Sequence, residues 1–383
     1  MAPNDTARLP HRLLLNAEPF GFGPTAAIAS FFPYLRDAFA SVGYVGKKHT
    51  LDLQRNLPYD AIHDMTNVPK PERGDMLRPV MEGYDILLTA MDHKVAEIAK
   101  EAGLKVIYYD ALAWYWPSFP ASVTNSDVYI AQNFFGVDTR LNDVFAHHAA
   151  AHIVPPIAPA PRAPQPREHV LINLGGLQNP FWPVAEVVEY ARTMIPILRR
   201  AVPANTKIII AGPEAVANAM ADYGVVTYPR AQMEDILART HVAFMTPGLG
   251  NIYDAAAFNV PTIWLPPAND SQGQQLKIME AHDMIDAALD WAPVLGNAGI
   301  DYSRDQPSVL AAIAQTATRL AREPQLQARL CDMATDHFYT VSRKRDSKSV
   351  AITQRFGCGG ERAVADIVIK AASGIKAARM HYA

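Results

Sequence analysis

Short apolar runs typical of buried strands alternate with helical patterns along this chain, and a proline-rich segment divides the alternation in two. The apolar run between Arg12 and Glu18 predicts a buried strand. A glycine turn over residues 21–24 follows, and from Ile28 to Val42 apolar residues recur at the spacing of one helix face. Strand, turn and helix in this order predict a doubly wound α/β domain with a parallel sheet.

The alternation continues through most of the chain. Further strands are predicted over residues 85–91, 105–112, 128–135, 169–174, 207–212, 225–229, 241–246 and 261–266. Helices are predicted over residues 94–102, 184–198, 214–221, 233–239 and 252–258. Two consecutive α/β halves are therefore expected.

Residues 155–166 contain six prolines. Proline lacks an N–H donor and fixes φ, so this segment fits neither a helix interior nor a central strand and is expected to be a stiff linker. We expect an N-terminal domain over residues 1–154, a linker over 155–166, a C-terminal domain over 167–345 and a helical tail over 346–383.

Length and composition limit the classes of protein. A chain of 383 residues is too long for one ordinary core, and a net charge of -3 without a long basic run argues against nucleic acid as a partner. Two cysteines cannot form a disulfide framework. Neither a signal peptide nor an apolar run of roughly 18 residues is present, so a cytoplasmic protein without a transmembrane segment is expected. Peripheral membrane contact and a homodimer stay open.

The segment from Thr246 to Asp254 is the most informative for function. A predicted strand ends there, and a glycine turn lets the backbone approach a ligand. The turn contains Gly248, Leu249 and Gly250. Asn251 is expected to cap the next helix, whose N-terminal N–H groups would suit a diphosphate. Asp254 lies about one turn into that helix, where it could accept hydrogen bonds from ribose hydroxyls or serve only as a favourable first-turn acid.

This order of elements resembles the donor-binding half of the GT-B glycosyltransferases, especially the branch with the enzyme that adds GlcNAc to lipid I. That family has an acidic residue, usually Glu, seven positions before the proline that opens the next strand, and here Asp254 stands seven before Pro261. A Gln-Gln pair follows the next loop in that family and contacts the donor sugar, and Gln274 and Gln275 match it. The departures are Asp for Glu, and Asn259-Val before the proline.

The resemblance covers residues 175–275. It implies that a glycine loop faces the sugar donor's phosphates and that the segment before the 233–239 helix recognises the nucleobase, largely through backbone groups. The implied donor-binding residues are Gly175, Gly176, Tyr228, Arg230, Thr246, Gly248, Leu249, Gly250, Asn251, Asp254, Asp270, Gln274 and Gln275. The implied fold is α/β, with two Rossmann-like doubly wound domains facing each other across a cleft.

The first domain should then hold the acceptor and the general base. Its loop of Gly21, Phe22 and Gly23 resembles the family's acceptor-side glycine loop but lacks the His that several relatives carry. Trp114 and Trp116 could form a stacking wall for a flat acceptor, or close a core or a lid.

The candidates for the base lie at predicted strand ends. Asp92 and His93 follow one strand, where a carboxylate or imidazole could deprotonate an acceptor, although Asp92 could instead cap the next helix. Glu18 and Asp110 compete with them.

No metal or other cofactor is expected. His148 and His152 would share one side of a helix and could bind zinc only with a third ligand. No Asp-x-Asp motif is present, so helix N-termini and backbone amides should stabilise the leaving diphosphate.

The leading prediction is an inverting, metal-independent glycosyltransferase that moves a sugar from a nucleotide-diphosphate sugar, expected to be a UDP-sugar, to a small-molecule acceptor. The GFGP loop, the aromatic cluster and the length are similar to cytosylglucuronate synthases, which implies UDP-glucuronate and cytosine, with Lys277 or Arg230 as the cation near the sugar. A UDP-sugar 2-epimerase or hydrolase, and a non-catalytic nucleotide-sugar binding partner, are the alternatives. A dinucleotide oxidoreductase is disfavoured because neither half has GxGxxG.

Overall fold

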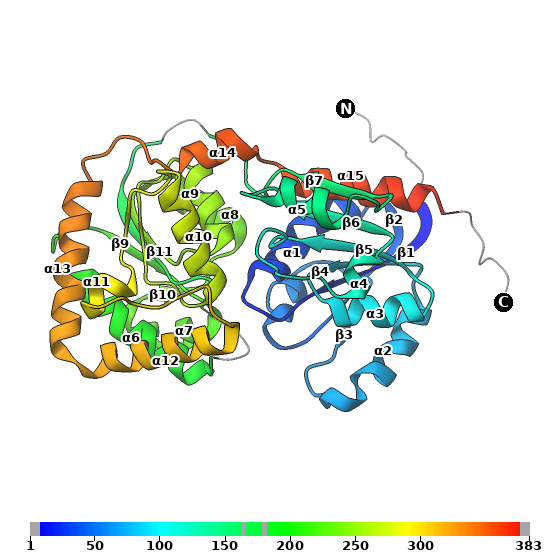
Figure 1. Ribbon diagram of the computed structural model, residues 1–383, viewed down its shortest axis with the longest axis horizontal. Helices are drawn as coiled ribbons and strands as arrows, with labels where there is room; N and C mark the ends of the chain where they lie inside the picture. Colours follow the sequence, from blue (N-terminus) through cyan, green and yellow to red (C-terminus); the bar gives the residue numbers. More distant parts are fainter. Residues whose placement is uncertain (1–7, 163–164, 178–181, 376–383) are drawn as a thin grey trace. The chain divides into compact units, whose positions relative to one another are not determined.

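The computed structural model describes residues 8–162, 165–177 and 182–375, which belong to two compact units (Figure 1). The first unit comprises residues 1–157 and 359–383, and the second comprises residues 158–358. The boundary near residue 157 falls in the proline-rich segment, which has neither helix nor strand over residues 155–162. The expected tail is shared, because Val350–Phe356 (α14) lies in the second unit and Gly360–Ser373 (α15) lies in the first.

The first unit is built on a parallel seven-stranded sheet with the order β3-β2-β1-β4-β5-β6-β7. Its strands are β1 (Leu9–Ala17), β2 (Phe39–Gly46), β3 (Ala61–Asp64), β4 (Ile86–Ala90), β5 (Lys105–Asp110), β6 (Val128–Gln132) and β7 (Ala151–Val154). Its other helices are α1 (Gly23–Leu35), α2 (Arg73–Glu82), α3 (His93–Glu101), α4 (Ala121–Thr124) and α5 (Val137–Val144), with short 3-10 turns at Lys48–Leu51, Gln54–Asn56 and Lys70–Glu72. The order reverses between β1 and β4, which makes that junction the switch point of the sheet.

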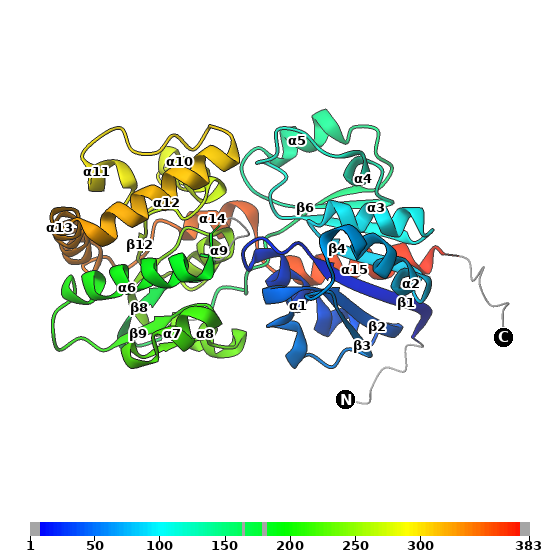
Figure 2. The same cartoon turned by 90° about the horizontal axis from the view of Figure 1, so that it is seen from below.

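The helices of this unit form two groups. Helices α1 and α15 pack against each other, and α15 also contacts β1, β6 and β7. Phe31 and Ile28 of α1 are fully buried, as are Val364 and Val368 of α15. Helix α3 packs against α2 and α4 (Figure 2). Helix α15 is therefore part of this core although it lies some 200 residues later in the chain.

Two predictions for this unit are wrong. The helix expected to run to Val42 ends at Leu35, and Phe39–Gly46 forms β2 instead. Phe39, Val42 and Tyr44 are fully buried, and a short apolar run of this kind fits a buried strand as well as a helix. The helix expected to carry His148 and His152 is also absent, because α5 ends at Val144 and His152 lies on the edge strand β7.

The second unit contains a parallel six-stranded sheet with the order β10-β9-β8-β11-β12-β13. Its strands are β8 (His169–Asn173), β9 (Ile208–Ala211), β10 (Val225–Val226), β11 (Thr240–Met245), β12 (Thr262–Trp264) and β13 (Ala287–Ala288). Its helices are α6 (Val184–Arg200), α7 (Glu214–Ala219), α8 (Arg230–Ala238), α9 (Leu249–Ala257), α10 (Asp270–Ala281), α11 (Trp291–Leu295), α12 (Gln306–Arg322), α13 (Pro324–Val341) and α14, with a 3-10 turn at Ala221–Tyr223. All five predicted strands are present, and β13 was not predicted.

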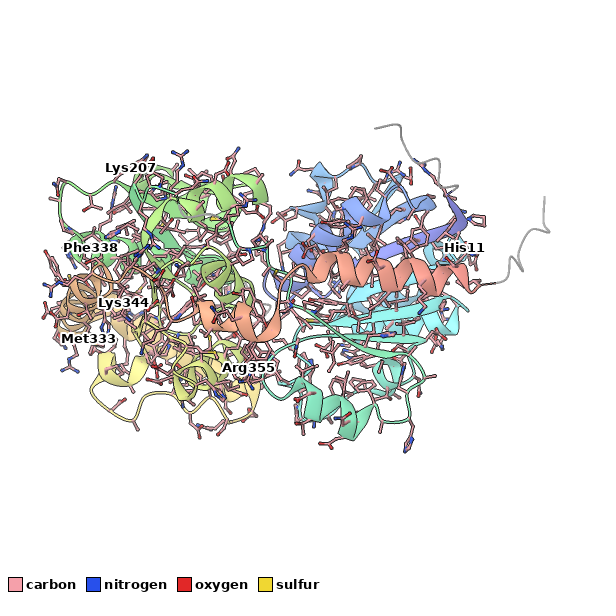
Figure 3. The ribbon with its side chains drawn as sticks, turned by 90° about the horizontal axis from the view of Figure 1, so that it is seen from above. His11, Lys207, Met333, Phe338, Lys344 and Arg355 are labelled. Carbon is pink, nitrogen blue, oxygen red and sulfur yellow. The ribbon has the colours of Figure 1, made fainter. Side chains whose placement is uncertain are left out.

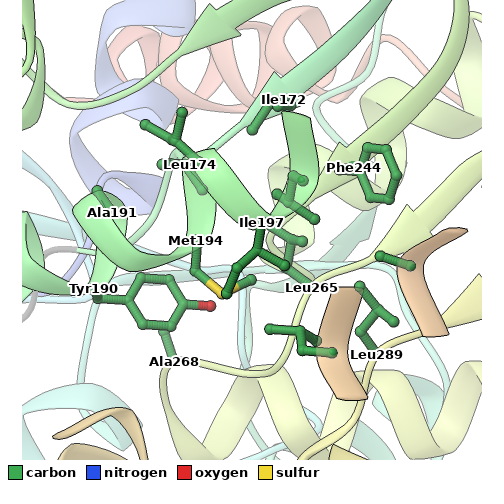
Figure 4. Packing of buried hydrophobic residues seen from close by; sticks show 14 of the residues in the cluster. Ile172, Leu174, Tyr190, Ala191, Met194, Ile197, Phe244, Leu265, Ala268 and Leu289 are labelled. Atoms are coloured by element: carbon green, nitrogen blue, oxygen red, sulfur yellow. The ribbon is translucent and has the colours of Figure 1, made fainter. Parts of the chain in front are cut away.

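The core of the second unit forms around α6. Met194 and Ile197 of this helix are buried against Ile172 of β8, Phe244 of β11 and Leu265 (Figure 4). This burial explains the apolar stripe that predicted the helix, since a helix must cover that face to be stable in a globular protein.

Helix α13 covers the same side of the sheet and packs against α6. Phe338 of α13, labelled in Figure 3, stacks on Phe244, with ring centroids 6.4 Å apart. Lys344 lies 2.9 Å from a carboxylate oxygen of the buried Asp286, which also accepts from the hydroxyl of Ser347 at 2.6 Å. Among the helices of the described ranges, none has the length and apolar character needed to cross a bilayer.

Candidate functional site

The second unit has its switch point between β8 and β11, where the strand order reverses. The loops that leave these two strands and β12 therefore meet at the carboxyl edge of the sheet. They carry the glycine pair at 175–176, the turn from Thr246 to Gly248 and the segment before α10. Ligands of open α/β sheets bind at such an edge, so these three loops form the first part of the candidate site.

A closed ring of hydrogen bonds joins the first two loops. The backbone N–H of Gly175 donates to Oδ1 of Asn173 at 2.9 Å, and Nδ2 of Asn173 donates to Oδ1 of Asn251 at 3.2 Å. Nδ2 of Asn251 donates to the carbonyl and to Oγ1 of Thr246, each at 2.9 Å, and the Thr246 hydroxyl donates to the carbonyl of Gly175. The ring fixes the glycine pair against the start of α9. The sequence analysis did not single out Asn173. A polar residue at the end of a strand is common, and only its hydrogen bond to Asn251 marks this one as part of the site.

Gln272 joins the third loop to the same arrangement. Its Oε1 accepts from the backbone N–H of Ala268 at 2.9 Å, and its Nε2 donates to the carbonyl of Gly176 at 3.2 Å. The side chain is buried, and the Asn269 side chain caps α10 by accepting from the Gln272 N–H at 2.9 Å. Gln272 was also missed, because the family pattern points to the Gln pair two positions later.

The start of α9 is suited to an anion. Gly248 is the N-cap, so the prediction of Asn251 in that role is wrong, and no side chain of the described residues caps the helix. Asn251 lies inside the first turn, where its amide donates to the Thr246 carbonyl. Within residues 8–162, 165–177 and 182–375, a Cβ added to Gly250 would meet no atom within 4 Å. Backbone N–H groups and the helix dipole favour negative charge there.

Asp254 lies in the middle of α9 and is engaged by an arginine. Its Oδ2 and Oδ1 each accept from the guanidinium of Arg230, at 2.8 Å to Nη1 and 2.8 Å to Nη2. Burial raises the pKa of Asp254, and the Arg230 charge opposes that shift. Arg230 is the first residue of α8, which begins three residues earlier than predicted, and the half-buried Tyr228 stands two positions before it.

The remaining predicted donor-binding residues lie on α10. Asp270 is buried, and Nε2 of Gln306 lies 3.4 Å from each of its carboxylate oxygens. Gln274 donates to the carbonyl of Tyr302 at 2.8 Å. Gln275 is buried, and its Oε1 has no hydrogen-bond partner within the described ranges. Gln275 therefore has an unused buried acceptor among the described residues.

The first unit presents two acids at its own switch point, after β1 and β4. Glu18 follows β1 and donates its backbone N–H to the carbonyl of Ala90 at 2.9 Å, and its carboxyl group lies close enough to Asp92 to be affected by its charge. Burial and the charge of Asp92 raise the pKa of Glu18 to about 8, while Lys47 and Lys94 oppose the shift. A pair of neighbouring carboxyl groups of this kind holds one proton between them near neutral pH.

Asp92 also caps the next helix. Its Oδ1 accepts from the Val95 N–H at 3.1 Å, as the structural alternative expected, and its preceding residue Met91 has a φ of 67°. That left-handed conformation is uncommon for a residue other than glycine, and it turns the chain out of β4. Burial raises the pKa of Asp92 as well. His93, the first residue of α3, is half-buried.

Asp110 has a structural role. Its carboxylate accepts from the Leu112 N–H at 2.7 Å, the Tyr129 hydroxyl at 2.9 Å and Nε1 of Trp116 at 3.3 Å. Burial raises its pKa to about 6. The carboxylate, which accepts these three hydrogen bonds, thus orients Trp116, while Trp114 packs on Phe134 with ring centroids 5.3 Å apart.

An imidazole reaches the glycine loop from another part of the chain. Nε2 of His49 lies 3.0 Å from the carbonyl of Gly21, and its ring lies 5.6 Å from that of Phe22. Gly23 begins α1. Burial lowers the pKa of His49, so the ring is neutral at neutral pH. No sequence motif pointed to this residue, since it comes from the turn after β2.

The comparisons with known proteins identify the fold. No family model matches the sequence, and no curated protein matches it. Among solved structures the chain is similar to Acinetobacter baumannii MurG, at 12% identity over 94% of this chain and 100% of that chain, with a TM-score of 0.53. It is also similar to Arabidopsis thaliana UGT89C1 in complexes with quercetin and with UDP-L-rhamnose, at 12% identity over 95% of this chain and 99% of that chain, with TM-scores of 0.52 and 0.51.

These similarities and the two parallel sheets define the class: each unit is Rossmann-like, and together they have the GT-B fold of glycosyltransferases. Within the part of the chain that the structure describes, no three His, Cys, Asp or Glu side chains are grouped to hold a metal ion.

Proposed function

We propose that this protein is an inverting, metal-independent glycosyltransferase that transfers a sugar from a UDP-sugar to a small-molecule acceptor. The observation that carries the proposal is the hydrogen-bonded ring of Asn173, Gly175, Thr246 and Asn251 beside the uncapped start of α9. This arrangement offers fixed backbone amides at the switch point of the second unit, where a diphosphate would bind.

The neighbouring side chains suit the rest of a nucleotide-sugar. Asp254 is one turn further along α9, where it can accept from the ribose hydroxyls. Gln275 has a buried acceptor that no group in the described part of the chain uses, which suits a hydroxyl of the transferred sugar. The uracil ring of the nucleotide would lie beside Tyr228 and the start of α8. That UGT89C1 has been solved with UDP-L-rhamnose supports the choice of a UDP-sugar for a chain of this fold.

The carboxyl pair of the first unit supplies the general base that deprotonates the acceptor. The ionised member of the pair formed by Glu18 and Asp92 takes the proton from the acceptor's O–H or N–H group as that atom bonds to the anomeric carbon. The bond from the anomeric carbon to the diphosphate oxygen breaks, and its electron pair leaves with UDP. Attack from the opposite face inverts the anomeric configuration. Backbone amides at α9 would stabilise the charge on the leaving diphosphate.

For the substrates we propose UDP-glucuronate and cytosine or a related nucleobase. A uronate needs a cation near the sugar. Arg230 already pairs with Asp254 and Glu234, so Lys277 of α10, whose Nζ lies 5.1 Å from the centre of the Tyr302 ring, is the better choice. A flat base would suit the aromatic side chains around Trp116.

Two measurements test this function. A panel of UDP-, GDP- and dTDP-sugars is first screened by thermal shift, where a ligand at 100 times its Kd stabilises the protein by about 2.7 kcal/mol. UDP-sugars should raise the melting temperature. The bound donor is then incubated with candidate acceptors, cytosine included, and the products are identified by mass spectrometry. If the sugar donor alone gives free sugar or an epimer, the protein is a hydrolase or an epimerase and the proposed transferase activity is wrong.

A further inference from the structure

Arg230 is held at three nitrogens by two acids. Besides its two bonds of 2.8 Å to Asp254, it donates from Nε to Oε1 of Glu234 at 2.8 Å, one turn further along α8. The side chain of Asp254 is only 9% exposed, whereas that of Arg230 is 53% exposed. The guanidinium therefore lies at the surface end of a buried carboxylate and closes one side of it.

The network continues away from Asp254. Oε2 of Glu234 accepts from Nη2 of Arg162 at 2.5 Å, and the Arg162 guanidinium lies over the ring of Phe258, 5.5 Å from its centre. Acid and base thus alternate from Asp254 to Arg230, Glu234 and Arg162, all within the second unit. Each partner fixes the rotamer of the one before it, so Arg230 has little freedom to leave Asp254.

The way in which Arg230 binds leaves Asp254 able to bind something else. An ionised carboxylate has two oxygens with about four acceptor positions. The planar fork of an arginine occupies one position on each oxygen, and the second position on each stays available. Two adjacent acceptors of this kind match a pair of neighbouring hydroxyl groups, which is the pattern of the 2′- and 3′-hydroxyls of a ribose.

We infer that Arg230 is a positioning residue: it holds the Asp254 carboxylate ionised and in one orientation, so that the carboxylate selects a sugar donor whose nucleoside carries both ribose hydroxyls. This inference rests on the proposed function. Arg230 itself need not touch the donor. Its role is to keep a buried acid charged, because an isolated buried carboxylate takes up a proton and loses acceptor strength.

Few charges act on this carboxylate. Arg230 and Glu234 of α8 face Asp254. Helix α14 also packs against α9 and carries Arg355, whose guanidinium lies over the Phe356 ring at 5.5 Å from its centre. Removing Arg230 takes away the group that opposes the effect of burial, so the pKa of Asp254 should rise further. The carboxylate would then form only at higher pH.

The test compares the binding of UDP and 2′-deoxy-UDP to the full-length protein by calorimetry from pH 6 to pH 8.5. Wild type should bind UDP more tightly than 2′-deoxy-UDP by roughly 10- to 100-fold, the value of a hydrogen bond to a charged group. In Arg230→Ala this preference should be lost at pH 6 and return partly as the pH rises. A general disturbance of the fold would weaken the binding of UDP and of 2′-deoxy-UDP equally.

Three further proteins complete the test. Arg230→Ala combined with Asp254→Asn leaves no buried charge without a partner, so it should fold and bind both ligands equally at every pH. Arg239→Ala, which removes an ion pair with Glu168 at the other end of α8, should keep the wild-type preference. Arg230→Lys should retain only part of it, since an ammonium cannot form the fork.

The outcomes separate the two proposals. If wild type does not bind UDP, both the proposed function and this inference are overturned. If wild type prefers UDP and Arg230→Ala shows the same preference and the same flat pH profile, only the role of Arg230 is overturned.

Discussion

Glu18 and Asp92 are neighbouring acids at the ends of two adjacent strands, β1 and β4, and the charge of Asp92 acts on the Glu18 carboxyl group. Their backbones are fixed by the sheet, and Asp92 is fixed further as the cap of α3. The two carboxyl groups are therefore held together in a buried place where both cannot be ionised at little cost. Such a pair can accept a proton from an acceptor molecule without first reorganising.

Replacement of the first acid should remove catalysis and spare sugar-donor binding. For Glu18→Gln we expect kcat/KM for the acceptor to fall by roughly 10²- to 10⁴-fold, the usual contribution of a general base, because an amide cannot share a proton with Asp92 and the pair no longer acts as one base. The Kd of UDP should stay unchanged because the nucleotide binds the second unit. Steady-state kinetics and calorimetry measure the two quantities. Glu97→Gln, an exposed position on α3, is the control. Wild-type kcat/KM in Glu18→Gln would rule out this acid as the base.

The same acid should make stability depend on pH in a defined direction. Burial and Asp92 raise the pKa of Glu18 from 4.5 to about 8, so the folded protein holds a proton that the unfolded chain releases. The contribution of this proton to the free energy of unfolding is complete below pH 4.5 and is lost as the pH rises through 8. Urea unfolding of both proteins should show that the free energy of unfolding falls less in Glu18→Gln than in wild type between pH 4.5 and pH 8. Parallel profiles would contradict the raised pKa.

Loss of the Gln272 amide should loosen the glycine loop. Gln272→Leu leaves the Ala268 N–H and the Gly176 carbonyl without their partner, at about 1–3 kcal/mol for each buried group. We expect weaker UDP binding and a higher KM for the sugar donor with little change in kcat. Gln327→Leu, which loses a bond of 3.0 Å to the Leu320 carbonyl at the end of α12, should lower stability alone. Equal UDP affinity in both variants would contradict the role of Gln272.

The core of the second unit should be sensitive to truncation at α6. Met194 is fully buried among Ile172, Phe244 and Leu265, so Met194→Ala should cost about 2–5 kcal/mol of unfolding free energy. Denaturant titration measures this cost. Met76→Ala, at a residue that is 52% exposed on α2, should change the unfolding free energy by less than about 0.5 kcal/mol. Similar losses in both variants would mean that the α6 face is not packed as described.

The sequence predicted the sheet strands where their pattern was strong and failed where it was ambiguous. Buried strands such as His169–Asn173 can be predicted from a continuous apolar run between polar residues. The segment at Phe39–Gly46 has apolar residues that satisfy both the helical period and a buried strand, and only the sheet order decides between them. His152 could not be placed, because a four-residue edge strand carries too little pattern.

For the site, strand ends could be located but their partners could not. Glu18 and Asp92 were each expected at a strand end, yet their contact depends on β1 and β4 being neighbours, which no local pattern gives. Likewise Asp254 was placed on its helix, while its pairing with Arg230, 24 residues earlier, follows from the packing of α8 on α9. Long-range pairing of polar groups is what the sequence leaves out.

The central claim is that the start of α9 binds the diphosphate of a UDP-sugar. A crystal structure of the protein with UDP tests it most directly, with the phosphate positions read from the electron density. We predict both phosphates beside the backbone amides of residues 249–251 and the glycine pair at 175–176, with the ribose hydroxyls at Asp254. Nucleotide density away from α9 in the second unit, or a crystal saturated with UDP that shows none, would contradict the account.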